Sequence, residues 1–169
     1  LFIQFTNTLG FEMQPLADLT IYGFGFRPAI KTVVSAGCKA FDVGEKKFFD
    51  DPFDLWEALK QSDPDILFLE TNGQGNDPAI EILHRIRHHN ESRNPYLPLI
   101  AVSPHRSKRD VMNAIDAGFH EYLVLPLTGQ RLWTAMTNTV FLGRPFVRTK
   151  DYFGPCRRRR ADLSYTGEE

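Results

Sequence analysis

The stretch Pro64-Asp65-Ile66-Leu67-Phe68-Leu69-Glu70 determines how the rest of the chain is interpreted. Its four consecutive apolar residues are too few for a helix, and they lie between a proline and a glycine-rich segment. Such a run is typical of a strand that is buried on both faces of a parallel sheet. Glu70 is therefore expected at the carboxyl end of this strand, where open parallel sheets place their functional crevice.

Strand-like and helix-like segments alternate five times along the chain, and this stretch is the third of the strands. The expected strands cover residues 18–22, 38–43, 66–70, 99–103 and 122–124. The expected helices cover residues 28–37, 50–61, 77–89, 108–117 and 128–142, with Asp50 or Asp51 capping the second and Thr128 capping the last. This alternation predicts an α/β fold in which right-handed crossovers cover both faces of a parallel sheet.

Two segments carry a resemblance to a known family. The run PDILFLETNGQGND (residues 64–77) resembles the third strand and following loop of bacterial response-regulator receiver domains. The run AIDAGFHEYLVLP (residues 114–126) is similar to the pattern AxxAGAxDYLxKP of that family. The resemblance extends over about residues 18–142. It implies a flavodoxin-like (βα)5 receiver fold with strand order 2-1-3-4-5 and a role in two-component, or phosphorelay, signalling in the bacterial cytoplasm.

The resemblance also assigns positions at the phosphorylation site of the family. Phosphoryl transfer to a carboxylate needs a metal held by acidic groups, a cation near the phosphoryl oxygens, and hydroxyl or amide donors. Glu70 occupies the position of the phospho-accepting aspartate. Ser103 occupies the hydroxyl position, and Tyr122 that of the aromatic residue that switches rotamer. Leu125 stands where the family has its lysine.

The acidic pair that follows the first strand in receivers has no counterpart. The matching positions are Gly23 and Phe24 or Gly25 and Phe26, and none of these side chains binds a divalent cation. The sequence therefore predicts a pseudo-receiver with no metal, no cofactor and no phosphorylation. One hypothesis is that Glu70 and Ser103 form a fixed hydrogen bond that resembles the active arrangement. The alternative is that Glu70 is a solvated carboxylate.

Composition limits the other functions. The chain has 169 residues, 42% of them apolar, and a net charge of −1, which favours one domain without a general attraction to nucleic acid or anionic membrane. Its two cysteines lack CxxC spacing, as expected in a reducing cytoplasm. No apolar run approaches the roughly 20 residues that span a bilayer.

The flanking segments suggest contacts with partners. Residues 1–17 form an apolar extension that is expected to cover its own domain or a second copy. Residues 143–169 form a basic tail without a predicted strand or helix, whose string YFGPCRRRR resembles the FGPxRR tails that follow some bacterial signalling domains. Four roles stay open for this tail: it binds another protein, it holds two copies of the chain together, it binds nucleic acid, or it makes no defined contact.

The last expected helix offers a second apolar line that includes Trp133 and Phe141. It is interpreted as a partner surface, unless the apolar extension covers it. His105 and His120 are expected to be loop residues.

The functional prediction is a non-enzymatic domain that binds a protein partner, either a histidine kinase or an output protein. A homodimer is a further possibility. The alternatives are a conventional phospho-acceptor and a nucleic-acid adaptor.

Overall fold

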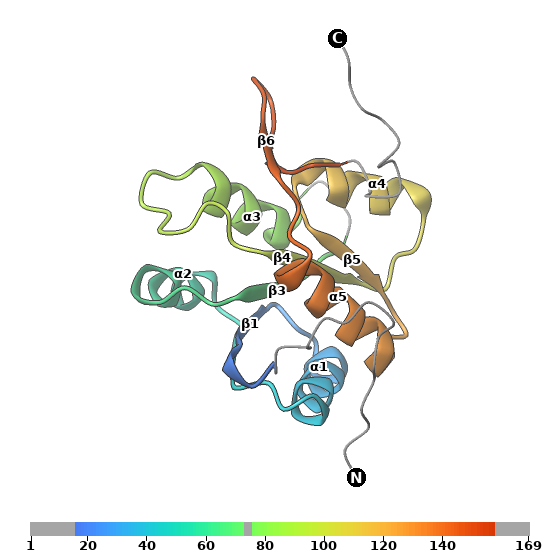
Figure 1. Ribbon diagram of the computed structural model, residues 1–169. Coiled ribbons are helices and arrows are strands. Elements are labelled where there is room, and N and C mark those ends of the chain that lie inside the picture. Colours follow the sequence, from blue (N-terminus) through green and yellow to red (C-terminus); the bar gives the residue numbers. More distant parts are fainter. Residues whose placement is uncertain (1–15, 73–75, 158–169) are drawn as a thin grey trace.

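The computed structural model describes residues 16–72 and 76–157. Its main sheet has five parallel strands in the order β2-β1-β3-β4-β5, which confirms the predicted flavodoxin-like fold (Figure 1). The strands are β1 (Thr20–Phe24), β2 (Glu45–Phe49), β3 (Ile66–Glu70), β4 (Leu99–Ser103) and β5 (Glu121–Val124). The helices are α1 (Pro28–Ala40), α2 (Pro52–Gln61), α3 (Pro78–His88), α4 (Lys108–Ala117) and α5 (Gly129–Phe141).

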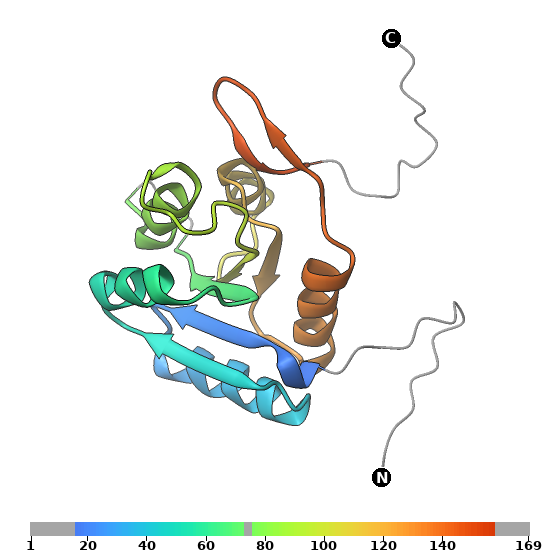
Figure 2. The same ribbon diagram turned by 60° about the vertical axis from the view of Figure 1, so that its left-hand side comes forward.

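Helices cover both faces of the sheet and enclose two hydrophobic cores. Helices α1 and α5 lie on one face, and α2, α3 and α4 lie on the other (Figure 2). Strand β3 serves both cores, because Ile66 and Phe68 belong to the first and Leu67 and Leu69 to the second. All four side chains are fully buried, which confirms that this run is a central strand.

The helix starts follow local capping rules. Asp51 accepts hydrogen bonds from the backbone N–H groups of Phe53 and Asp54, and Asp77 accepts one from Ala79. Thr128 does the same at the start of α5. Each cap satisfies donors that the first helical turn leaves unpaired. The predicted starts of these three helices are confirmed.

The predicted second strand, residues 38–43, is wrong. Helix α1 continues through Gly37 to Ala40, and β2 comes later, at Glu45–Phe49. A Cβ on Gly37 would lie 2.3 Å from Leu132 Cδ2, so this glycine permits α1 and α5 to pack closely and does not stop the helix. Strand β2 was missed because it is an edge strand whose half-exposed residues, EKKFF, lack a clear apolar period.

The tail forms a β-hairpin, which the sequence analysis did not expect. Strand β6 (Phe146–Arg148) pairs antiparallel with β7 (Phe153–Pro155). The hairpin follows α5 and extends from the body of the domain near α3 and α4 (Figures 1 and 2). Strands of three residues are too short to show a period in the sequence. Residues 158–169, which include most of the arginine run, lie outside the described residues.

Aromatic rings hold the base of the hairpin against the domain. Phe153 is 5% exposed, and its ring lies 5.5 Å from that of Phe146 and 5.3 Å from that of Tyr96. The ring of Phe146 in turn lies 5.5 Å from that of His120. These residues come from three separate parts of the chain, so the hairpin closes the end of the sheet at which β4 and β5 begin.

Arg87 is buried beneath this hairpin and supports it. Its guanidinium donates to the carbonyl oxygens of Pro95, Leu97 and Gly118, and it lies 5.2 Å from the ring centre of Phe146. Burial lowers the pKa of Arg87 to about 10. The side chain therefore joins the loop before β4 to the loop before β5.

His120 lies in the loop before β5, as expected, but its side chain is buried. Its Nδ1 accepts a hydrogen bond from the backbone N–H of Leu99, at the start of β4. Burial, together with the positive charges of Arg87 and Arg144, lowers its pKa to about 3, so the imidazole is neutral in the folded protein.

The apolar extension is only partly described. Leu16 belongs to the short 3-10 helix η1 (Leu16–Asp18) and is buried in the core between α1, α5 and the sheet. Residues 1–15 lie outside the described residues, so the prediction that they cover the domain or a second copy stays a prediction. In the described part of the chain, each helix is too short or too polar to cross a bilayer.

Candidate functional site

Glu70 forms an ion pair with Arg27 at the carboxyl edge of the sheet. Its Oε1 lies 2.5 Å from Arg27 Nε, and its Oε2 accepts a hydrogen bond of 2.7 Å from the backbone N–H of Arg27. The Glu70 side chain is 10% exposed, whereas that of Arg27 is 59% exposed. Both carboxylate oxygens are thus engaged by one residue, which also stands at the start of α1, where the helix dipole favours negative charge.

Glu70 lies at the end of β3 as predicted, whereas its partner Arg27 was not predicted. Two features of the sequence could have indicated this partner. Arg27 is the cation in the turn between the first strand and Pro28, and parallel neighbouring strands bring that turn to the end of the strand that carries Glu70. The register places Phe24 opposite Leu69, so the turn after Phe24 lies next to Glu70.

The four positions that match the acidic pair of receivers lie at the end of β1 and in the turn after it: Gly23, Phe24, Gly25 and Phe26. Gly23 and Phe24 belong to β1, which runs two residues further than predicted. Phe24 is buried in the core beneath α2 and α3, while Phe26 is buried in the core beneath α1 and α5. A Cβ on Gly23 would lie 2.7 Å from the ring of Phe48, so aromatic rings fill the space beside this backbone.

Gly25 is in the left-handed region, with φ of +72°, and its N–H donates to the carbonyl oxygen of Phe49. A side chain at this position would therefore be strained, although no neighbouring atom crowds it. The turn between β1 and α1 thus presents a tight backbone and buried rings at the carboxyl edge.

Ser103 and Tyr122 meet at the loop after β4 and do not contact Glu70. Ser103 Oγ accepts a hydrogen bond of 3.1 Å from the backbone N–H of His105, and the Tyr122 hydroxyl donates to the His105 carbonyl oxygen at 2.8 Å. Burial raises the pKa of Tyr122. The predicted hydrogen bond between Glu70 and Ser103 is therefore wrong, because each group has another partner. The alternative, a solvated Glu70, also fails, since Arg27 covers its carboxylate.

Leu125, at the lysine position of the resemblance, follows β5. Its backbone N–H donates to the Ser103 carbonyl oxygen, and its side chain packs against the core between α1, α5 and the sheet. No cluster of three histidine, cysteine or acidic side chains that could hold a metal occurs in residues 16–72 and 76–157.

Trp133 and Phe141 differ in their exposure on α5. The Trp133 ring is half-buried and lies 5.0 Å from the ring of Phe41, just after α1. Phe141 is exposed, as is Leu142 beside it. Trp133 therefore helps to join α1 to α5, and the exposed part of the proposed partner surface is confined to the end of α5.

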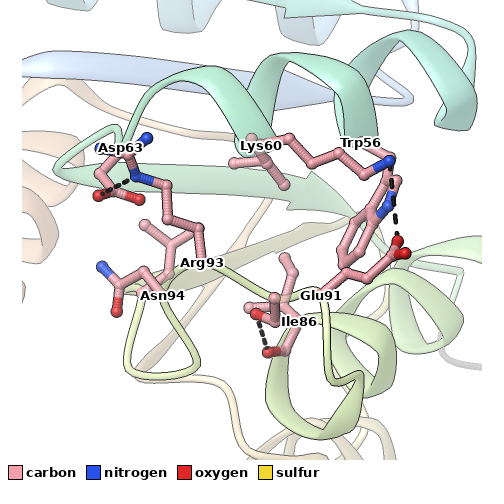
Figure 3. A pocket seen from close by; sticks show the side chains of 10 residues that line it. Trp56, Lys60, Asp63, Ile86, Glu91, Arg93 and Asn94 are labelled. Atoms are coloured by element: carbon pink, nitrogen blue, oxygen red, sulfur yellow. Dashed lines mark hydrogen bonds and ion pairs between the residues drawn. The ribbon is translucent and has the colours of Figure 1, made fainter.

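A small cavity lies between α2 and the loop that follows α3 (Figure 3). Trp56 and Leu97 contribute to its apolar lining, and paired charges such as Asp63 with Arg93 stand at its edge. Its volume of about 10 Å³ has room for about one water molecule. This volume excludes a cofactor site here.

Basic residues of the tail make contacts within the domain. Arg144 pairs with Glu121 at 3.1 Å, and Arg157 pairs with Asp116 at 3.2 Å. The guanidinium of Arg148 lies 4.1 Å from the ring centre of Phe153. These three cations are therefore partly neutralised or covered, which reduces the charge that the hairpin offers to nucleic acid.

Comparison with known proteins identifies the fold. No protein-family model matches the chain, and no curated protein matches it. Chemotaxis response regulator CheY4 of Vibrio cholerae is similar in structure, with a TM-score of 0.58 and 14% identity over 71% of this chain and 97% of that chain. The receiver domain of sensor histidine kinase PA1611 from Pseudomonas aeruginosa has a TM-score of 0.55 and 17% identity over 72% and 97%.

NtrX from Brucella abortus is also similar, with a TM-score of 0.60 and 19% identity, over 72% of this chain and 26% of that chain. At these identities the likeness establishes the fold. The chain has the fold of response-regulator receiver domains.

The ion pair between Arg27 and Glu70 is open to a direct test. We expect Arg27→Ala to lower the free energy of unfolding by about 1 kcal/mol, because Arg27 is 59% exposed and an ion pair with a solvent-exposed partner contributes little. In a double-mutant cycle with Glu70→Gln, urea denaturation should give a coupling energy of about 0.5–1 kcal/mol. A coupling energy of zero would mean that the two side chains do not interact in solution.

Proposed function

We propose that this chain is a receiver-fold signalling domain that works through protein contacts and does not accept a phosphoryl group. The observation that carries this proposal is the engagement of both Glu70 carboxylate oxygens by Arg27. An acceptor carboxylate must present a free oxygen to the phosphorus in line with the leaving group. Here the guanidinium and the backbone N–H of one residue occupy the oxygens that would attack.

The groups around Glu70 also do not fit Mg²⁺. Magnesium prefers an octahedral set of oxygen ligands, which usually includes one or two carboxylates. Gly23 and Gly25 have no side chain, and the rings of Phe24 and Phe26 are buried in the two cores. By contrast, the PA1611 receiver domain holds a magnesium ion in its active-site cleft. The chemistry of these side chains supports a domain without the metal-dependent route.

A cation that could neutralise a transferred phosphoryl group is also absent from the position after β5. Leu125 stands there and packs its side chain against the core. Together with Glu70 in place of aspartate, these features support the interpretation as a pseudo-receiver. A non-enzymatic role follows, and the free thiols of Cys38 and Cys156 fit a cytoplasmic location.

The partner in this proposal is a histidine kinase or an output protein, and its contact includes the exposed end of α5. Phe141 and Leu142 are exposed apolar side chains on neighbouring positions. Trp133 contributes by fixing α5 against α1. Phe141→Ala should weaken capture of the partner without unfolding the domain, whereas Trp133→Ala should also lower stability.

Phosphorylation is tested by incubation with a small phosphodonor and Mg²⁺, followed by mass spectrometry of the intact protein. We expect no added phosphoryl group on the unaltered chain. Glu70→Asp, which introduces the acceptor residue of the family, should also stay unlabelled, because the metal ligands and the lysine are still missing. Mg²⁺-dependent labelling at Glu70 would contradict the proposal and favour the conventional phospho-acceptor.

A further inference from the structure

Two exposed corners of opposite charge lie at the carboxyl edge of the sheet. The acidic corner joins β2 to α2 and consists of Asp50, Asp51, Phe53 and Asp54. The basic corner joins β4 to α4 and consists of Arg106, Lys108, Arg109 and Met112. All eight side chains are exposed.

The charges of both corners have no ion-pair partner within the described residues. Asp51 caps α2 through its Oδ1, but neither it nor Asp50 and Asp54 lies within ion-pair distance of a cation there. The same holds for the three cations of the basic corner. Other surface charges of the domain, such as Lys60 and Arg93, do pair within the chain.

Each corner also presents one exposed apolar side chain. Phe53 is 67% exposed on the first turn of α2, and Met112 is 45% exposed on the second turn of α4. Methionine is an adaptable side chain that makes favourable contacts with aromatic rings. The basic corner also contains Asp110, which accepts a hydrogen bond from Ser107, but its net charge stays positive. Each corner thus combines a net charge of one sign with an apolar centre, and the two corners complement each other in both respects.

The two corners cannot reach each other within one molecule. In the strand order, β1 and β3 lie between β2 and β4. At about 4.8 Å for each strand spacing, the corners are about 14 Å apart. Because α2 and α4 cover the same face of the sheet, with α3 between them, both corners are open to a partner that approaches this edge (Figure 2).

We propose that the partner of this edge is a second copy of the chain, docked so that the acidic corner of each copy contacts the basic corner of the other. A two-fold axis midway between the corners makes both contacts at once, because the line from acidic to basic corner is reversed in the second copy. The opposed charges favour this orientation over others, and the pairing of Phe53 with Met112 supplies apolar contact. This dimer would cover the Glu70 edge of both copies, and it does not depend on whether Glu70 accepts phosphate.

Charge reversal tests the proposal. Sedimentation of the full chain at about 50 µM and low salt should give a species of twice 19.4 kDa, and raising the salt should weaken association by about tenfold, because screening reduces attraction between exposed charges. The double variants Lys108→Glu/Arg109→Glu and Asp50→Lys/Asp54→Lys should each be monomeric. The matched control Lys39→Glu/Lys150→Glu, which changes exposed lysines elsewhere, should dimerise as the unaltered chain does.

The decisive sample is an equimolar mixture of the two monomeric variants. In the mixture each variant supplies the charge that the other has lost, so a dimer should return. This return also shows that both variants are folded. Three results would overturn the proposal: a monomeric unaltered chain, a dimer that persists in either variant, or a mixture that assembles beyond two copies, which would indicate a head-to-tail contact.

Discussion

Replacing Phe153 with alanine is expected to lower the free energy of unfolding by about 3–4 kcal/mol, the usual cost of removing a buried phenylalanine. The ring is 5% exposed, and it contacts Phe146, Tyr96 and His88 from three parts of the chain. Its loss would leave a cavity between the hairpin and the end of the sheet. Urea denaturation, monitored by tryptophan fluorescence or circular dichroism, measures this change in the free energy of unfolding.

Val147→Ala serves as a matched control for Phe153→Ala, since Val147 belongs to the same hairpin but is 37% exposed. It should cost less than about 1 kcal/mol. If Phe153→Ala costs no more than this control, the hairpin does not pack on the domain in solution, and the tail then has no defined contact, one of the possibilities that its composition left open.

The second large effect is expected for Arg87→Met. This change keeps an unbranched side chain, although a shorter one, and removes the donors to the carbonyl oxygens of Pro95, Leu97 and Gly118. Buried acceptors that lose a partner cost about 1–3 kcal/mol each, while removal of a buried charge offsets part of this cost. We expect a net loss of about 3 kcal/mol of unfolding free energy.

Two controls accompany Arg87→Met. Arg85→Met, on the exposed side of the same helix, should cost less than about 1 kcal/mol, because it removes one exposed contact with the ring of Trp56. Arg87→Lys should fall between the two, since an ammonium group cannot reach three carbonyl oxygens in the fork geometry of a guanidinium. If Arg87→Met is as stable as the unaltered protein, these hydrogen bonds make no net contribution to the free energy of unfolding.

Both predictions concern contacts that a sequence reading does not reveal. The chain from residue 143 onward is basic, has few apolar residues in succession and is interrupted by glycine and proline, so no strand or helix was predicted there. Phe153 becomes buried, and Phe146 half-buried, only because Arg87, Tyr96 and His120 converge from other elements. Three-residue strands have no periodic signal of their own, and their pairing depends on this surface.

The candidate site was predicted in part for the same reason. The position of Glu70 at the end of a buried strand follows from the local pattern, and the structure confirms it. Its partner does not follow from the local pattern, because Arg27 is 43 residues away in sequence and its proximity depends on the alignment of β1 with β3. The hypothesis of a bond to Ser103 failed because the loop after β4 folds back and uses the Ser103 hydroxyl itself.

The amino-acid sequence was enough to predict the alternation of strands and helices, the buried strand that ends at Glu70, and helix starts at Asp50 or Asp51, at Asp77 and at Thr128. These features are local, since apolar periodicity and capping act over a few neighbouring residues. The three-dimensional fold was needed to establish the place of β2, the packing of the hairpin and the pairing of Arg27 with Glu70. Each of these features depends on contacts between distant segments, and such contacts form when the sheet brings those segments together.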